Sequence, residues 1–280
     1  MNYDAMILGY RRHLVITALG LVILLNAVVP LRAQFIGQPG SSRASEGYRV
    51  ELLAGMWSPT PAMNIASDAF GISGTHIDLT RDLGVSTKRF ADLRLRLRAG
   101  RRHRFRIDYL PVQYETETVV ERRLVFRGIA YDTNLPVRST LRWRTWRFGY
   151  EYDVVRRDRG YFGLILDVKH TELEASLNSA LAQEFVRARG PIPAAGATLG
   201  FSLASAVSVA AEITAMRLPK DIANGYSGRS VDFDIYTTIN LIEWFGLQVG
   251  YRSLDLSLVA NEDWADLRLE GVYLGVLLHF

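Results

Sequence analysis

The feature that most constrains the fold of this 280-residue chain is an alternation of apolar and charged residues with a period of two. Residues 89–98 read RFADLRLRLR, and from Ala91 to Arg98 alanine or leucine at every second position alternates with aspartate or arginine. Successive side chains of a strand point to opposite faces, and the segment therefore predicts a strand with one apolar and one charged face. Arginine at every second position is incompatible with a dry sandwich core. It can face water on an open sheet or line the inside of a wet barrel.

The same alternation recurs along the chain. We predict ten strands, at about 47–57, 88–98, 103–118, 135–155, 161–176, 192–204, 206–217, 230–242, 245–258 and 265–280. The connectors alternate between short ones and longer or polar ones, which is typical of transmembrane barrels with short periplasmic turns and longer extracellular loops. The predicted fold is all-β: an antiparallel transmembrane β-barrel of about ten strands over residues 47–280. Eight or twelve strands are the alternatives in number, and a soluble β-barrel is the alternative class.

The N-terminus predicts export. Arg11 and Arg12 precede an apolar run from Leu14 to Val29, and the small residue Ala33 follows. This is the layout of a signal peptide, so we expect residues 1–33 to be cleaved and residues 34–46 to form a short polar leader; a single membrane anchor is the alternative. Removing residues 1–33 removes three arginines and one aspartate, which lowers the formal net charge from +4 to +2. This small charge predicts no nucleic-acid partner, and the absence of cysteine excludes disulfides and thiolate metal sites.

The last ten residues read GVYLGVLLHF and continue the alternation to the final residue. One face of this segment carries the apolar residues Val272, Leu274, Val276, Leu278 and Phe280. The last residues of soluble domains usually fray, whereas the last strand of a barrel must pair with the first and present an apolar face to lipid. A terminal aromatic residue with this pattern resembles the signal that the outer-membrane barrel-assembly machinery reads. We therefore expect that machinery and outer-membrane lipid to be partners.

With the apolar positions facing outward, nine cations and nine anions face the lumen. They are Arg49, Glu51, Asp92, Arg94, Arg96, Arg98, Arg104, Arg106, Asp108, Arg147, Glu151, Asp153, Asp167, Lys169, Glu212, Asp232, Asp234 and Arg252. A ten-stranded barrel is narrow, and guanidinium–carboxylate pairs could fill it. We predict an internal salt-bridge network that closes the lumen, with a small polar conduit as the alternative. A selective pore would more naturally carry an excess of one sign.

Outward-facing arginines suggest a contact with lipopolysaccharide. Arg142 and Arg144 share a face with Trp146 and Phe148, and aromatic side chains favour the membrane–water boundary. If these rings mark the rim, the two arginines lie just above the acyl zone, where a guanidinium can bind phosphate. A solvated loop base with loosely paired arginines is the alternative.

Signals for catalysis are weak. After signal cleavage four histidines remain, and only His170, beside Glu172 on one strand face, is paired with a carboxylate; no nucleophile accompanies them. There is no convincing metal cluster and no Gly-rich phosphate loop. We therefore predict a non-enzymatic protein without a cofactor, and a rim-located lipid- or peptide-cleaving enzyme is the weaker alternative.

Two segments carry a resemblance to a known family. Residues 74–85 read GTHIDLTRDLGV, a strand that contains His103-Arg104 follows, and residues 108–152 end in Tyr-Glu-Tyr. Over roughly residues 47–280 the chain resembles a family of uncharacterised bacterial outer-membrane β-barrel proteins. The resemblance implies the fold and a location in the outer membrane of a Gram-negative-type bacterium, and it brings no assigned reaction. We expect a structural or surface-interaction role, with a small-solute channel as the alternative, and hairpins at 75–79 and 124–131 in the long loops.

Overall fold

The computed structural model describes residues 48–68, 73–126, 128–131, 136–178, 183–218, 226–260 and 263–280. The predicted signal peptide (1–33) and leader (34–46) lie outside the described residues. The strands are β1 (Val50–Ser67), β2 (Ile77–Asp78), β3 (Phe90–Ala99), β4 (His103–Val119), β5 (Leu124–Phe126), β6 (Ile129–Tyr131), β7 (Pro136–Arg157), β8 (Gly160–Asn178), β9 (Gln183–Ser202), β10 (Val207–Leu218), β11 (Tyr226–Ile242), β12 (Phe245–Ala260) and β13 (Asp263–His279). Within these ranges, no helix has the length and apolar character needed to cross a membrane.

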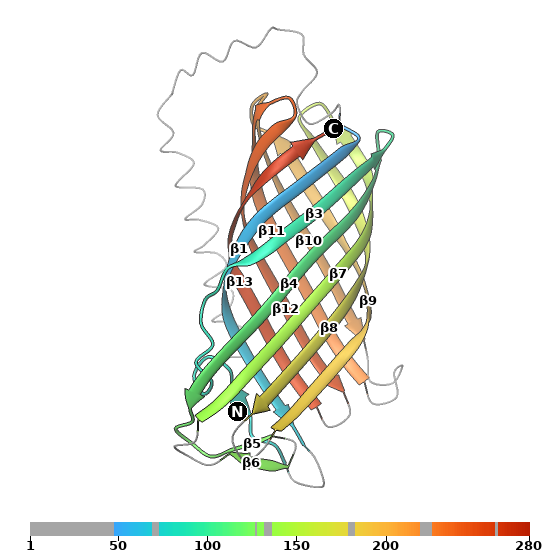
Figure 1. Cartoon of the computed structure of the whole chain (residues 1–280). Helices are drawn as coiled ribbons and strands as arrows, with labels where there is room; N and C mark the ends of the chain where they lie inside the picture. The colour runs from blue at the N-terminus through green and yellow to red at the C-terminus, as the bar shows by residue number, and fades with distance from the viewer. Residues whose placement is uncertain are drawn as a thin grey trace, which may run out of the picture. The chain divides into compact units, whose positions relative to one another are not determined.

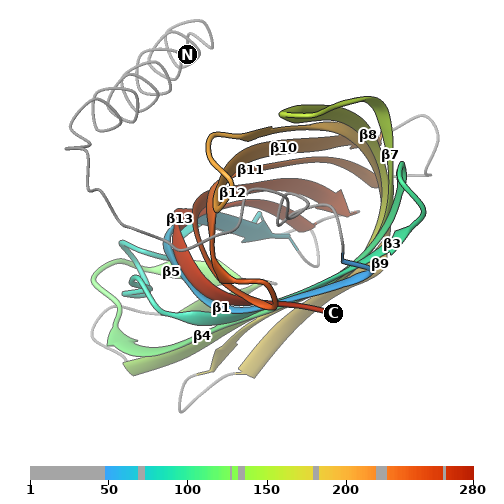
Figure 2. The same cartoon turned by 90° about the horizontal axis from the view of Figure 1, so that it is seen from above.

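Ten of these strands form a closed antiparallel barrel. The main sheet runs β13-β12-β11-β10-β9-β8-β7-β4-β3-β1, and β13 pairs with β1 to close it. Figures 1 and 2 show the tilted strands and the lumen that they surround. The closing pairs run from Glu51–His279 to Ser67–Asp263, so the last strand bonds to the first along its whole length. The prediction of an all-β barrel of ten strands is confirmed, and closure leaves this seam without a free sheet edge.

Glycines permit the close approach of the strands at this seam. Gly55 and Gly275 lie directly opposite each other. A Cβ atom added at Gly55 would lie 2.8 Å from the Leu274 carbonyl oxygen, and one added at Gly271 would lie 2.2 Å from that of Ser58. Side chains at these positions would therefore push β1 and β13 apart.

Both ends of the barrel chain lie at the end that carries the short turns. In Figure 1 the C-terminus is at this end, and the small β5–β6 hairpin is at the other. Two of the long-loop connections are shorter than we predicted, because β1 continues to Ser67 rather than ending near 57 and β9 begins at Gln183 rather than near 192. The hairpin predicted at 124–131 is confirmed as β5–β6, whereas the segment at 75–79 pairs through β2 with β1.

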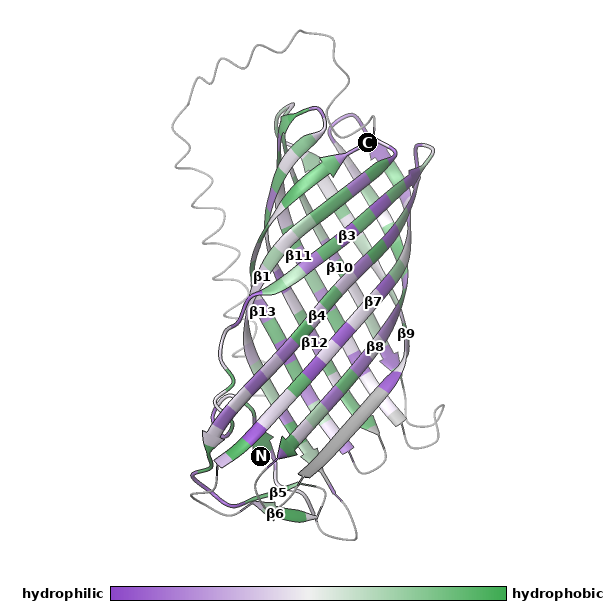
Figure 3. Cartoon of the chain, in the orientation of Figure 1, coloured by the Kyte–Doolittle hydropathy of each residue, from purple (hydrophilic) through white to green (hydrophobic). Residues whose placement is uncertain are grey.

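The outer face has two zones. The half nearer the short turns carries most of the exposed large apolar side chains; we call this zone the apolar band. It includes Leu52, Met56, Leu93, Phe105, Trp146, Phe148, Leu164, Leu166, Val168, Leu199, Phe201, Ile213, Ile239, Leu247, Val249, Val272, Leu274, Val276 and Phe280. On β13 the band covers nine residues from Val272 to Phe280, close to the roughly 9–11 residues that a tilted strand needs to cross a bilayer. Figure 3 shows how hydrophobic and hydrophilic residues alternate along the strands.

Beyond the band, the strands continue as a polar collar. Ion pairs link neighbouring strands on its outer face: Glu117–Arg138, Arg142–Glu174, Arg144–Glu172, Arg229–Asp255 and Asp255–Arg268. A row of charges on the outside is incompatible with acyl chains. The barrel therefore extends past the apolar band on the long-loop side.

β3 is shorter than its two neighbours, and this leaves an opening in the wall of the collar. β1 pairs with β3 only up to Trp57, and β4 pairs with β3 only up to Tyr109. Residues 58–67 of β1 and 110–119 of β4 extend past β3 on the two sides of the opening. Residues 73–89, which precede β3, lie here; we call them loop 1.

Loop 1 hydrogen bonds to both sides of this opening. The Leu79 N–H donates to the Met63 carbonyl of β1 at 3.0 Å. The Lys88 ammonium donates to the Gln113 carbonyl of β4 at 3.0 Å. Loop 1 therefore substitutes for the missing length of β3.

Prolines remove donors from the two edges of the opening. The N–H and C=O groups of a strand residue point to the same side, and residues two apart share that side. Pro59 and Pro61 therefore face the opening like Met63, and Pro111 faces it like Gln113. Because proline has no N–H, these edges carry fewer unsatisfied donors and are poor templates for another strand.

Candidate functional site

The lumen holds the charged residues that the alternation assigned to the inner face. Within the described strands these side chains lie at the inward-facing positions of the alternation, where the buried residues also lie. Arg49 is exposed, at the end of the lumen bounded by the short turns. We call this end the short-turn mouth. From the mouth inward, the ions form three groups, followed by an apolar layer under the long loops.

The first group lies near the mouth and centres on Asp153, which is fully buried. Arg104 lies 2.5 Å from Glu151 and 2.5 Å from Asp153. Arg156 lies 2.7 Å from the other oxygen of Asp153. Arg156 was not among the predicted lumen residues. A β-bulge between Asp153 and Val155 turns it inward, because the extra residue reverses the alternation.

The second group crosses the middle of the barrel. Arg106 pairs with Glu212, which also accepts a hydrogen bond from the Tyr236 hydroxyl at 3.0 Å. Arg96 lies 2.5 Å from Asp108. A further pair joins Arg147 to Asp167. Arg106 is on β4 and Glu212 on β10, so this pair spans the lumen rather than linking neighbouring strands.

The third group is a square of two cations and two anions. Arg94 lies 2.6 Å from Asp92 and 2.8 Å from Asp234. Arg252 lies 3.2 Å from Asp92 and 3.1 Å from Asp234. The four side chains are between 1% and 10% exposed. Tyr273 lies against the square, where its hydroxyl donates to Asp234 at 3.0 Å.

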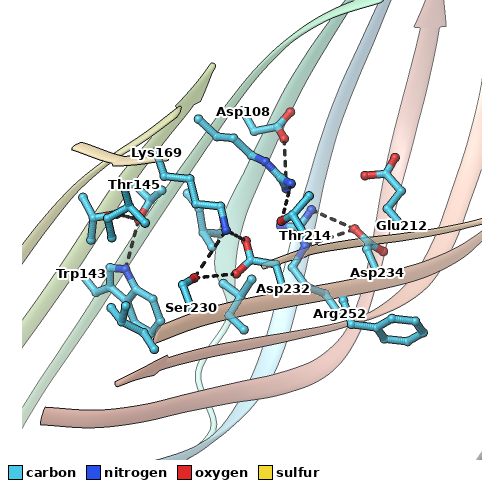
Figure 4. A pocket seen from close by; sticks show the side chains of 17 residues that line it. Asp108, Trp143, Thr145, Lys169, Glu212, Thr214, Ser230, Asp232, Asp234 and Arg252 are labelled. Atoms are coloured by element: carbon cyan, nitrogen blue, oxygen red, sulfur yellow. Dashed lines mark hydrogen bonds and ion pairs between the residues drawn. The ribbon is translucent and has the colours of Figure 1, made fainter. Parts of the chain in front are cut away.

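A small cavity separates these ions from the apolar layer. Its volume is about 50 Å³, enough for roughly three or four water molecules. Figure 4 shows Lys169 reaching Asp232 and Ser230 on one wall and Trp143 donating to Thr145 on the other. The Lys169–Asp232 distance is 2.7 Å. This cavity is therefore a small space with a mixed lining, in which paired polar side chains meet apolar ones such as Leu110, Ile192 and Leu256.

The apolar layer fills the lumen on the long-loop side. Loop 1 contributes part of it, and the chain between β4 and β7, whose described residues 120–126 and 128–131 we call loop 2, contributes the rest with the strands. Its deeply buried members, each at most 3% exposed, include Met63, Ile77, Leu79, Leu83, Val85, Val120, Leu124, Phe126, Tyr131, Val137, Leu141 and Leu177. The alternation along the strands does not predict this layer, because its loop members are buried only where loops 1 and 2 fold into the end of the barrel.

An ion pair fastens the two loops together. Arg122 of loop 2 lies 2.5 Å from Asp82 of loop 1, and it also donates to the His76 carbonyl at 2.8 Å. Burial raises the pKa of Asp82, but the hydrogen bonds and charge of Arg122 outweigh burial and hold this pKa below its ordinary value of 3.8. Asp82 is therefore ionised near neutral pH and keeps the loops joined.

At the mouth, the two ends of the barrel chain meet through side chains. His279 lies opposite Glu51, with Nε2 3.3 Å from its carboxylate, and its ring stacks on Tyr48 at 3.7 Å. The other predicted residue at this level, Arg98, is partly buried and lines the mouth. Tyr236, Tyr273 and His279 lie at inward positions of the alternation, so their parity was the signal that could have identified them.

The remaining predicted residues lie on the outer face. Phe280 and the apolar residues at 272, 274 and 276 are 40–70% exposed in the apolar band, and Leu278 shares their face. Arg142 and Arg144 lie in the collar directly beyond Trp146 and Phe148, and their side chains are 44% and 52% exposed. Both arginines already pair with a glutamate of β8, at 3.2 Å and 2.8 Å.

The described histidines His76, His103 and His279 have aromatic or carboxylate partners. His103 bonds to the Tyr150 hydroxyl at 2.7 Å, and His76 packs edge-on against Trp264. Glu172, which shares a face with His170, is engaged by Arg144. Over the described part of the chain, no histidine bonds to a serine or threonine hydroxyl, and no group of three His, Asp or Glu residues is placed to hold a metal ion.

Comparisons with known proteins identify the class of fold. No protein-family model and no curated protein sequence matches the chain. Among solved structures, the chain is similar to the outer membrane protease OmpT from Escherichia coli, with a TM-score of 0.56 and 6% identity over 84% of this chain and 98% of that one. The transport unit of the autotransporter AIDA-I from Escherichia coli gives 0.40 and 8% over 89% and 94%, and the Pseudomonas putida toluene transporter TodX gives 0.35 and 10% over 86% and 93%.

The fold is thus that of a bacterial outer-membrane β-barrel protein. At 6% identity the similarity to OmpT extends to the fold alone, so the protease activity in its description belongs to that protein.

Proposed function

We propose that this protein is a non-enzymatic outer-membrane β-barrel with a closed lumen, which acts through its outer surface and loops. The observation that supports the proposal is that two successive layers of side chains, one charged and one apolar, fill the lumen. Ion pairs such as Arg106–Glu212 cross the middle of the barrel, and side chains of loops 1 and 2 that are at most 3% exposed fill the long-loop end. A small-solute channel needs a continuous polar path, and two successive layers of packed side chains oppose one.

The apolar band supports a location in the outer membrane. Its nine-residue width on β13 suits a bilayer, and a closed barrel leaves no strand edge in lipid. With a cleaved signal peptide, the short turns would face the periplasm and the collar would face outward. The mature chain should fractionate with outer membranes and migrate differently on gels with and without heating. Recovery as a soluble periplasmic protein without detergent would contradict this location.

The collar supports a surface role in contact with lipopolysaccharide. Arg142 and Arg144 retain exposed guanidinium groups at the edge of the band, and a guanidinium has five N–H donors, more than one glutamate can accept. The double variant Arg142→Gln/Arg144→Gln should retain less lipopolysaccharide in a pull-down with purified lipid. Arg138→Gln, on the same strand face but farther from the band, is the matched control. Equal retention by all three proteins would remove these two arginines from the proposal.

A vesicle-swelling assay tests whether the lumen is closed to small solutes. Vesicles that contain the purified barrel should swell no faster in isosmotic small sugars or amino acids than vesicles of lipid alone. Swelling that scales with the amount of folded barrel would favour the channel alternative.

A further inference from the structure

Two adjoining cavities open at the short-turn mouth. Their volumes are about 100 Å³ and 50 Å³, and they share Glu51, Arg98, Arg104 and Tyr236 in their linings. They lie at the opposite end of the lumen from the apolar layer. The mouth is thus a separate feature from the collar and loops on which the proposed function depends.

Positive charge predominates around these cavities. Six arginines line them, against four carboxylates. Two of the carboxylates, Glu151 and Glu212, are already paired with arginines of β4. Arg98 and Arg104 line both cavities, and Arg156 lines the larger one. An anion that entered here would relieve the repulsion among these guanidinium groups.

The arginines are held in fixed positions. Asp153 is fully buried behind them and accepts one N–H group from Arg104 at 2.5 Å and one from Arg156 at 2.7 Å. The Arg104 guanidinium also lies 4.3 Å above the ring of Tyr161. Gly200 permits this arrangement, since a Cβ atom there would lie 2.3 Å from the same ring.

Both guanidinium groups keep access to the mouth. The side chain of Arg104 is 13% exposed and that of Arg156 is 16% exposed, although their common partner Asp153 is 0% exposed. A guanidinium offers five N–H donors in a rigid fork that matches the geometry of phosphate and carboxylate groups. Arg104 also contacts Glu151, so the donors available to a ligand at the mouth are mainly the N–H groups of Arg156 that Asp153 does not use.

We propose that the short-turn mouth binds a small oxyanion, of the phosphate or carboxylate type, between Arg104, Arg156 and Arg98. Asp153 acts as a positioning residue that holds the first two guanidinium groups side by side. The enclosed volume of about 100 Å³ suits a small anion or one anionic group rather than a large solute.

Calorimetric titration of the folded barrel with inorganic phosphate tests this proposal. The barrel is held in an uncharged detergent at low ionic strength, because salt screens such contacts. Saturable binding is expected in the wild type, and Arg156→Gln should weaken it at least about tenfold, the loss expected when a charged hydrogen-bond partner worth roughly 1.5–3 kcal/mol is removed. Acetate and glycerol 3-phosphate in place of phosphate distinguish a carboxylate, a free phosphate and an esterified phosphate as the preferred group.

Arg159→Gln is the matched control, since Arg159 lies in the turn directly after β7 and carries the same charge as Arg156 but does not line either cavity. It should bind phosphate like the wild type. If Arg156→Gln fails to fold, Arg98→Gln replaces it, because Arg98 lines both cavities and is one of the three proposed ligands. Absence of saturable binding in the wild type would overturn the proposal, and so would equal weakening by the control and the lining variants.

Discussion

Asp234→Asn tests whether the charged square stabilises the barrel as an interdependent unit. Asp234 accepts hydrogen bonds from Arg94 at 2.8 Å, Arg252 at 3.1 Å and Tyr273 at 3.0 Å. Its neutralisation leaves two buried guanidinium groups with Asp92 as their nearest carboxylate. Removing one partner from a buried ion pair costs about 3–5 kcal/mol. Because Asp92 still contacts both arginines, we expect the lower end, a loss of about 3 kcal/mol in the free energy of unfolding.

A second variant restores the charge balance. In Asp234→Asn/Arg252→Met, Arg94 and Asp92 remain as a pair 2.6 Å apart, and an apolar side chain replaces the surplus cation. Most of the loss should therefore be recovered, since replacing a buried ion by an apolar residue can be nearly neutral once its partner is gone. Glu174→Gln is the exposed control; it breaks the collar pair with Arg142 and should cost no more than about 1 kcal/mol.

Urea unfolding of the barrel in lipid vesicles measures these differences. Tryptophan fluorescence follows the transition, and gel mobility gives a second probe of the folded fraction. Equal dependence on urea among the variants would allow their midpoints to be compared as stabilities. A loss for Asp234→Asn no larger than that for Glu174→Gln, or no recovery in the double variant, would refute the idea of an interdependent square.

Three further results are expected. Glu151→Gln should destabilise the barrel less than Asp234→Asn in the same urea assay. The reason is that Arg104, the arginine nearest to Glu151, still has Asp153 as a partner at 2.5 Å. Deleting Phe280 should lower the folded, heat-modifiable fraction in membranes more than deleting the exposed loop residue Glu121, and equal assembly would contradict a role of the terminal strand in assembly. The ion pair between Asp82 and Arg122 that joins the two loops should be fully formed above pH 3.8. It should be lost as the pH falls through the lower pKa of Asp82 in the folded protein. Protease cleavage of the loops should therefore rise under acid conditions in the wild type, whereas Asp82→Asn should be cleaved at all pH values. A wild type without this pH dependence would argue against the role of the Asp82–Arg122 ion pair in joining the loops.

The period-two pattern predicted the barrel and the inner or outer face of most strand residues. It works because a strand that separates lipid from a polar interior must alternate, as residues 89–98 do. The pattern fails in the parts of the strands that lie beyond the apolar band, where the outward-facing residues are no longer apolar. Beyond Trp57 the outer face of β1 carries Ser58, Thr60 and Ala62, and the prolines at 59 and 61 argue against a strand.

The candidate site was predictable in composition but only partly in arrangement. The alternation indicated which ions share the lumen, but partners such as Arg106 and Glu212 lie on opposite parts of the barrel and their contact depends on its curvature. A bulge placed Arg156 among these ions, and no local sequence pattern marks it. The apolar layer was missed because Ile77 and Leu83 are buried only by the long-range folding of loop 1 into the opening beside β3.

Conductance across a planar lipid bilayer tests the central claim of a closed lumen most directly. The measurement uses the purified, folded wild-type barrel, with its folded state verified by gel mobility before insertion. We expect no steady current above that of the lipid alone, because the charged groups and the apolar layer block the path in series. Steady open-channel currents in the wild type, with an ion selectivity that changes in Asp234→Asn while its unfolding does not, would contradict a closed lumen and establish a pore.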